Sequence, residues 1–229
     1  MTDYVFPLPP PTSVPIAGST RGFPVRRIHC VGRNYADHAR EMGADPTRDA
    51  PFFFQKPADA IVVSGDSVPY PNLTGNLHHE IEYVVAIGRA GADIPLASAL
   101  EHVFGYAVGN DLTRRDLQLQ ARDKGRPWEP GKAFDHSAGI SAIHEVTQVG
   151  HLAAARIWLS VNGTPRQEAD IAELIWKVPE IVSILSTYVR LAPGDLIYTG
   201  TPAGVGPLQR GDLVEGGIDG LDTLSHRIV

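Results

Sequence analysis

Short runs of β-branched and aromatic residues, separated by turn-forming clusters, dominate the chain from Phe52 onward. The separating clusters include Ser64-Gly65-Asp66, Asn72-Leu73-Thr74-Gly75 and Pro193-Gly194-Asp195. Such punctuation is typical of short strands joined by tight turns. The pattern therefore predicts a β-rich, mixed α/β fold in which helices are few.

Helical periodicity is confined to a few segments. A short strand is expected at residues 27–31, followed by a polar helix near 34–42 that ends at Gly43. Further helical segments are expected at 96–102, 113–123 and 178–188. The last of these repeats Val178, Ile181, Val182 and Leu185 at helical spacing. We expect these short helices at the periphery of the fold.

The first 24 residues differ from the rest in their proline content, with Pro7, Pro9, Pro10, Pro11, Pro15 and Pro24. Proline removes a backbone donor and favours extended, polyproline-like geometry over helix or central strand. We therefore expect an N-terminal arm over residues 1–25. The remainder, residues 26–229, is predicted to form a single domain, because 43% hydrophobic content is enough to fill one core.

Charge and cysteine content narrow the classes of protein. The formal net charge is −6 with no basic stripe, which disfavours nucleic-acid and anionic-membrane partners. The single cysteine, Cys30, cannot form an internal disulfide, and no apolar run approaches the roughly 20 residues of a membrane-spanning helix. We expect a soluble, cytoplasmic protein. An anionic small substrate is still compatible, because a bound metal inverts the potential of its pocket.

Two carboxylates, Glu80 and Glu82, stand two residues apart at the entry to a strongly β-prone run. A strand would point both to the same face, where each raises the cost of ionising the other. A divalent cation removes that cost, although a solvated strand at a sheet edge is an equally physical alternative. His78 lies on the face of Glu80, so a histidine ligand is not excluded.

Asp111 follows the apolar run 103–110 and is a candidate third ligand. Its alternative role is to cap the next helix, with Thr113 and Asp116 forming a capping box. All-oxygen ligation suits Mg²⁺, Mn²⁺ or Ca²⁺, whereas zinc favours imidazole or thiolate. Spacing alone does not decide between a metal site and these structural roles.

Six motifs, in order along residues 28–229, resemble the fumarylacetoacetate hydrolase superfamily. They are Cys30-Val31-Gly32-Arg33-Asn34-Tyr35-Ala36-Asp37-His38 with Arg40-Glu41-Met42, Gln55-Lys56-Pro57, Asn76-Leu77-His78-His79-Glu80-Ile81-Glu82, Asn110-Asp111-Leu112-Thr113-Arg114-Arg115-Asp116, Gly131-Lys132-Ala133-Phe134-Asp135 and Tyr198-Thr199-Gly200-Thr201-Pro202-Ala203-Gly204-Val205-Gly206. The short N-terminal arm is most similar to the fumarylpyruvate hydrolase and acylpyruvase branch.

The resemblance implies a mixed β-roll with short peripheral helices, usually a homodimer, with Mg²⁺ or Mn²⁺ held by Glu80, Glu82 and Asp111. Ca²⁺ is a possible substitute for either ion. The implied activity is hydrolysis of a carbon-carbon bond in a 2,4-diketo acid. For fumarylpyruvate the products are fumarate and pyruvate, within the catabolism of aromatic compounds.

His38 and Glu41 are implied to be a catalytic dyad on a lid helix. Three residues apart on a helix, they share a face, so the carboxylate can orient and charge-stabilise the imidazole. On residues alone a polar surface helix would explain them as well. In the implied reaction His38 takes a proton from the attacking water. Lys132 stabilises the developing oxyanion or the substrate carboxylate; its alternative role is that of a surface lysine in a glycine-rich loop.

Four further residues are predicted to bind substrate. Arg33, Gln118 and Thr201 match family positions at the carboxylate end, and Lys56 is either a substrate contact or a structural buried charge. The loop 199–206 lacks the glycine-lysine-serine/threonine ending of a phosphate loop and is interpreted as a turn. No residue that grips the far end of a fumaryl group can be identified.

Three alternatives remain at this point. The same site could decarboxylate oxaloacetate or act as a broad acylpyruvase. It could instead isomerise or hydrate a related dienoic keto acid. In a different class, the chain could be a non-catalytic β-roll module with a structural metal, although that role has no use for a dyad.

Overall fold

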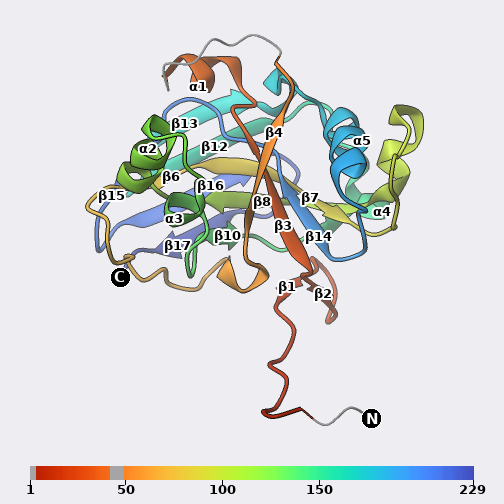
Figure 1. The fold of residues 1–229 in the computed structure, drawn as a ribbon, viewed down its shortest axis with the longest axis horizontal. Helices are drawn as coiled ribbons and strands as arrows, with labels where there is room; N and C mark the ends of the chain where they lie inside the picture. The colour runs from red at the N-terminus through yellow and green to blue at the C-terminus, as the bar shows by residue number, and fades with distance from the viewer. Residues whose placement is uncertain (1–3, 42–48) are drawn as a thin grey trace.

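The computed structural model describes residues 4–41 and 49–229 and is dominated by strands (Figure 1). The largest sheet has eight strands, in the order β4–β3–β14–β7–β8–β10–β5, with β11 also paired to β8. These strands are β3 (Arg27–Gly32), β4 (Phe52–Lys56), β5 (Ile61–Val63), β7 (Ile81–Ile87), β8 (Val103–Asp111), β10 (Ala138–Ile140), β11 (His144–Glu145) and β14 (Asp195–Tyr198). Parallel and antiparallel pairings are mixed, as in β3–β14 and β7–β8.

Three smaller sheets complete the β-structure. One is four-stranded, in the order β13–β12–β16–β17, and one is three-stranded, in the order β15–β6–β9. Their strands are β6 (Leu77–His79), β9 (Thr113–Arg114), β12 (Arg156–Val161), β13 (Thr164–Asp170), β15 (Gly206–Leu208), β16 (Leu213–Ile218) and β17 (Leu224–Arg227). An N-terminal hairpin pairs β1 (Ser13–Pro15) with β2 (Gly22–Pro24). The prediction of a β-rich, mixed α/β fold is confirmed.

Helices are short and lie around the strands, with α2 and α3 on one side and α4 and α5 on the other (Figure 1). They are α1 (Ala36–Glu41), α2 (Arg115–Asp123), α3 (Glu129–Lys132), α4 (Val146–Val149) and α5 (Val178–Tyr188), with 3₁₀ helices η1 (Ala58–Ala60), η2 (Leu96–His102) and η3 (Ile171–Glu173). Among the described residues, no helix is long and apolar enough to cross a membrane.

The predicted helices occur, with differences at their ends. Segment 178–188 is α5 and segment 96–102 is the 3₁₀ helix η2. The segment predicted at 113–123 begins two residues late, because Thr113 and Arg114 pair with β6 as a strand. The predicted helix at 34–42 is α1 from Ala36 to Glu41; its predicted final residue and the glycine stop lie outside the described residues.

Strand β7 is buried along its whole length and supplies both layers of the core. Tyr83 and Val85 join the larger cluster, which is shared with α5 and the four-stranded sheet. Val84 and Ala86 join the smaller cluster on the opposite face, with the hairpin residues Val14 and Phe23. An apolar run buried on two faces explains why the sequence of β7 lacks an apolar-polar alternation beyond Glu82.

Asp195, at the start of β14, ties that strand to its neighbour β3. Its fully buried carboxylate accepts hydrogen bonds from Arg26 at 3.1 Å and from Arg27 at 2.8 Å, and from the backbone N–H of Ala192 at 2.9 Å. The two arginines are partly exposed, so the carboxylate is the member that burial would penalise. The ion pairs between Asp195 and the two arginines therefore fix the parallel register of β14 on β3.

Asp195→Asn should therefore lower the free energy of unfolding by about 2 kcal/mol, because it removes the charge that both arginines pair with while keeping the side-chain shape. Denaturant titration followed by circular dichroism measures this loss. Glu168→Gln, which breaks an ion pair with Arg156 between half-exposed side chains, is the matched control and should cost much less. Equal losses in the two variants would contradict this role of Asp195.

Candidate active site

One pocket, next to the ends of β7 and β8, collects nearly all of the predicted site residues. Its lining comes from β3, α1, the β6–β7 junction, β8, α2, α3 and the loop after β14. The lining residues are Val31, Gly32, Arg33, His38, Phe54, Glu80, Glu82, Asp111, Arg115, Gln118, Leu119, Arg122, Trp128, Lys132 and Thr201. Segments distant in sequence thus meet in one concave site, as an enzyme requires.

Glu80, Glu82 and Asp111 form a buried carboxylate triplet. One ligand atom from each lies within 4.8 Å of the others, and none of the three residues is more than 4% exposed. Glu80 lies in the one-residue break between β6 and β7, where its N–H donates to the side chain of Asn110 at 2.9 Å. The prediction that one strand carries both glutamates is therefore wrong for Glu80, although the two carboxylates do converge.

Asp111 ends β8 and does not cap α2. That helix begins at Arg115, and no side-chain hydrogen bond caps it. Thr113 instead donates its hydroxyl to the backbone carbonyl of Asp111 at 2.9 Å. The helix-cap alternative is thus wrong, because Thr113 and Arg114 extend as a strand before the helix starts. Asp111 is left to face the pocket.

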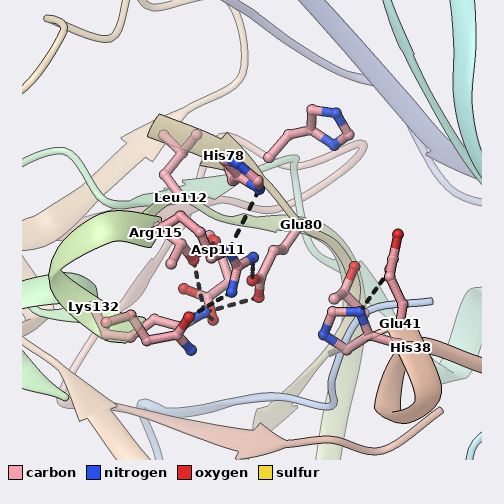
Figure 2. A network of polar contacts seen from close by, with 12 residues as sticks. His38, Glu41, His78, Glu80, Asp111, Leu112, Arg115 and Lys132 are labelled. Atoms are coloured by element: carbon pink, nitrogen blue, oxygen red, sulfur yellow. Dashed lines mark hydrogen bonds and ion pairs between the residues drawn. The ribbon is translucent and has the colours of Figure 1, made fainter. Parts of the chain in front are cut away.

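Three buried cations pair with two of the carboxylates, and Figure 2 shows two of these cations, Lys132 and Arg115. Lys132 donates to Glu80 at 2.8 Å, to Asp111 at 2.6 Å and to Thr113 at 2.7 Å. Lys56 pairs with the other oxygen of Asp111 at 2.8 Å, and Arg115 pairs with Glu80. Buried charges persist only when paired, so the set stabilises itself as a unit.

The pKa shifts in this cluster follow from burial and from these pairs. Burial alone would lower the pKa of Lys132, but Asp111 and Glu80 outweigh it and raise that pKa, so the ammonium keeps its proton. Burial alone would raise the pKa of Glu80, but Lys132 and Arg115 hold it well below its usual range. Lys132 therefore acts as a fixed positive charge and not as a base.

Glu82 is the member of the triplet with the poorest compensation. Burial, together with the charges of Asp111 and Glu80, raises its pKa well above the usual range. Its carboxylate accepts one backbone hydrogen bond, from Gly200 at 2.8 Å. A divalent cation beside the triplet would remove this penalty, and an all-oxygen donor set suits a hard ion such as Mg²⁺ or Mn²⁺. The residues present fit a metal ion.

Gly200 can reach Glu82 only because it has no side chain. Its φ is +100°, in the left-handed region, and a Cβ there would lie 2.8 Å from the Cβ of Asn34. Asn34 in turn donates to the carbonyl of Thr199 at 2.8 Å, which fixes the loop after β14 against the start of α1. The loop 199–206 is therefore a close-approach turn, as predicted.

His38 and Glu41 form the predicted pair on α1. The Nδ1 of His38 lies 3.2 Å from Oε2 of Glu41, whose carboxylate also accepts the N–H of Gly204 at 3.2 Å. Because a carboxylate only accepts, Nδ1 carries the hydrogen and Nε2 keeps its lone pair. Burial lowers the pKa of His38, against the opposing effects of Glu80 and Glu41. The imidazole is thus neutral at pH 7.

Figure 2 shows the His38 ring between Glu41 and the carboxylate cluster. His38 and the carboxylates of Glu80 and Asp111 therefore line the same pocket.

Helices α2 and α3 bring Gln118 and Lys132 together through a close backbone approach. A Cβ at Gly131 would lie 2.7 Å from the backbone nitrogen of Gln118, so only glycine permits this packing. Gln118 accepts a hydrogen bond from Arg115, which also binds Glu80. The packing of the two helices thereby orients polar groups toward one wall of the pocket.

The remaining predicted residues differ in their placement. Thr201 and Arg33 line the pocket; Thr201 accepts a hydrogen bond from Gln167 at 2.8 Å, and Arg33 has a left-handed φ of +56°. Lys56 lies beneath the pocket lining, bound to Asp111 and to the backbone carbonyl of Leu112. Its geometry matches the buried structural charge among the two predicted alternatives.

Several residues that line the pocket were not predicted from the sequence to be site residues. Arg115, Leu119 and Arg122 lie with Gln118 at helical spacing along one face of α2, while Phe54 and Trp128 form an aromatic wall with a ring-centroid distance of 5.8 Å. The spacing 115, 118, 119 and 122 is visible in the sequence, and would have flagged a polar helix face that turns inward. The aromatic wall joins distant segments and left no such signal.

A family model for the C-terminal region of fumarylacetoacetate (FAA) hydrolase matches residues 27–229. The chain therefore belongs to the fumarylacetoacetate hydrolase family, and its mixed sheets have the fold of that family.

The chain is similar to three proteins of known name. The crystal structure of fumarylpyruvate hydrolase from Pseudomonas aeruginosa, in complex with Mn²⁺ and pyruvate, superimposes with a TM-score of 0.97 at 57% identity and 99% coverage of both chains. A fumarylpyruvate hydrolase from a Ralstonia species is 45% identical over 79% of this chain and 94% of its own. A mitochondrial oxaloacetate tautomerase from Mus musculus is 42% identical over 89% and 91%.

The His38–Glu41 geometry predicts a histidine pKa below the ordinary 6.5 that falls further in Glu41→Gln, because the neutral amide no longer stabilises the imidazolium. Side-chain NMR titration measures this, with the His38 resonance assigned by its loss in His38→Gln. Glu168→Gln, at an exposed strand position, is the control and should leave that resonance unchanged. A His38 pKa that Glu41→Gln leaves in place would show that the carboxylate does not orient the ring.

Proposed function

We propose that this chain is a divalent-metal-dependent hydrolase that cleaves the carbon-carbon bond of a 2,4-diketo acid, converting fumarylpyruvate to fumarate and pyruvate. The observation that carries the proposal is that a neutral histidine held by a glutamate faces a buried carboxylate triplet across one pocket. The relatives at 57% and 45% identity bear the name of this activity.

Glu80, Glu82 and Asp111 would hold Mg²⁺ or Mn²⁺, with Ca²⁺ as a possible substitute. When bound, such an ion supplies Lewis acidity to the keto-acid end of the substrate and an electron sink for the pyruvate fragment. The charges of the cluster support this, because Asp111 and Glu80 pair with three cations, whereas Glu82 forms no ion pair among the described residues. Adding a divalent ion leaves two positive charges, which suit a dianionic substrate.

His38 would serve as the general base. Its Nε2 takes a proton from water while Glu41 and its Nδ1 hydrogen bond stabilise the resulting imidazolium. The hydroxide adds to the 4-carbonyl carbon. As that carbonyl re-forms, the bond between C3 and C4 breaks, and C3 receives the bonding electrons and then a proton. The lowered pKa of His38 keeps the base available at neutral pH.

Lys132, Gln118, Arg115 and Thr201 would bind and orient the oxygen atoms of the substrate. Lys132 stays protonated, so it supplies positive charge to a developing oxyanion at no cost in proton transfer. Arg33 at the rim would add a donor for a planar anion, while Lys56 acts through Asp111 as a positioning residue. From the resemblance we add a homodimer and a cytoplasmic role in the catabolism of aromatic compounds.

An oxaloacetate-directed activity is the second candidate, supported by the tautomerase relative at 42% identity. Decarboxylation of oxaloacetate would need the same hold on the keto-acid end but no activated water. The His38–Glu41 pair therefore favours hydrolysis over decarboxylation, since decarboxylation requires no base aimed at water.

A product assay on three substrates tests the proposal. The wild-type enzyme with Mn²⁺ should release fumarate and pyruvate from fumarylpyruvate in equal amounts, cleave acetylpyruvate, and act more slowly on oxaloacetate. His38→Ala should lower kcat on fumarylpyruvate by about 100-fold or more, because the base is lost. Products are quantified by chromatography.

His136→Ala, at an exposed histidine outside the pocket, is the matched control for that substitution. Decarboxylation of oxaloacetate that dominates turnover and survives His38→Ala would contradict the hydrolase assignment.

A further inference from the structure

The far end of the pocket carries a feature that the proposed chemistry does not use. Fumarylpyruvate has a second carboxylate, at the end of its fumaryl group, which a pocket selective for it must neutralise. Arg115, which pairs with Glu80 of the triplet, begins α2, and Arg122 lies near the C-terminal end of the same helix. We propose that Arg122 binds this distal carboxylate and makes the enzyme selective for acylpyruvates with a dicarboxylate skeleton. This inference rests on the proposed function.

Helix α2 sets the distance between the two ends of the site. Arg115 contacts Glu80 at the metal end, and Arg122 is seven residues farther along the same helix face. Seven residues of helix rise about 10 Å. The two carboxylate carbons of a seven-carbon diketo diacid are separated by six bonds, about 7–8 Å when extended. The flexible side chain of Arg122 can make up the difference between the helix rise and the carboxylate separation. Residues of one helix can therefore contact both ends of the substrate.

The wall between these two arginines has the chemistry of the middle of the substrate. Leu119 follows Gln118 on α2, and Phe54 of β4 and Trp128, the residue before α3, line the same pocket with their ring centroids 5.8 Å apart. This segment of the lining is apolar, which suits the uncharged CH=CH group that joins the 4-carbonyl to the distal carboxylate. The pocket therefore offers polar, apolar and cationic side chains for the three kinds of group in the substrate.

Arg33 is the competing cation, and its placement distinguishes it from Arg122. Its guanidinium carbon lies 5.7 Å from the centre of the Phe52 ring, and both residues line a second, more open cavity. The guanidinium of Arg33 is thus engaged with a ring that does not line the inner pocket. Arg122 also pairs with Asp123 at 3.1 Å through the exposed side of the helix, and it lines the inner pocket.

Binding of a non-cleavable pair of ligands tests the proposal independently of turnover. With Mn²⁺ present, calorimetry compares 2-oxopimelate, a seven-carbon 2-oxo diacid, with 2-oxoheptanoate, which lacks only the distal carboxylate. The wild type should prefer the diacid by about tenfold or more, as expected for one charge-assisted contact. Arg122→Gln should lose that preference, and Arg122→Lys should recover part of it.

The matched control is Arg126→Gln, which removes a positive charge four residues later at an exposed position outside the pocket, and should keep the wild-type preference. A preference that Arg122→Gln retains, or that Arg33→Gln abolishes in its place, would overturn the assignment. Loss in Arg126→Gln as well would reduce the effect to general electrostatics and overturn it too. Failure of the turnover assay would refute the hydrolase proposal alone, because this ligand pair requires no cleavage.

Discussion

The structure depends on a buried cluster of three carboxyl groups, Glu80, Glu82 and Asp111, and three cations, Lys56, Lys132 and Arg115. Each charge alone would be costly to bury, so each element that contributes one is tied to the others. The β6–β7 junction, β8, β4, α2 and α3 all meet here, and the apolar clusters on both faces of β7 hold them in place. Glu82 pairs with none of these cations, so a bound divalent ion would stabilise its charged form.

The pocket contains two groups of residues with different chemistry. One is the carboxylate triplet, which suits the keto-acid end of a substrate. The other is the His38–Glu41 pair, whose orientation depends on the backbone of Gly204 in the loop after β14. The N–H of Gly200 in the same loop donates to Glu82, so one turn positions both the triplet and the His38–Glu41 pair. Burial lowers the pKa of His38 without removing its glutamate partner, which favours a neutral base at physiological pH.

Much of the fold and of the candidate site could be predicted from the sequence, because the patterns that indicate them are local. Turn clusters and β-branched runs indicated the β-rich fold, and the six motifs contain every candidate site residue except Gln118. Eight of the ten candidates line the pocket. The errors have physical causes. Glu80 lies in a break between strands because the chain passes from one sheet to another there, and Asp111 caps nothing because Thr113 and Arg114 extend as a strand. The aromatic wall of Phe54 and Trp128 depends on tertiary packing, which no local pattern encodes.

The carboxylate triplet is suited to a divalent ion that in turn holds a keto-acid anion. Mn²⁺ binding followed by electron paramagnetic resonance, with and without oxalate as a mimic of the pyruvate enolate, measures this property. We expect one Mn²⁺ per chain, tighter binding with oxalate, and at least about tenfold weaker binding in Glu82→Gln but not in Glu101→Gln, at an exposed acid. Unchanged Mn²⁺ binding in Glu82→Gln would contradict it.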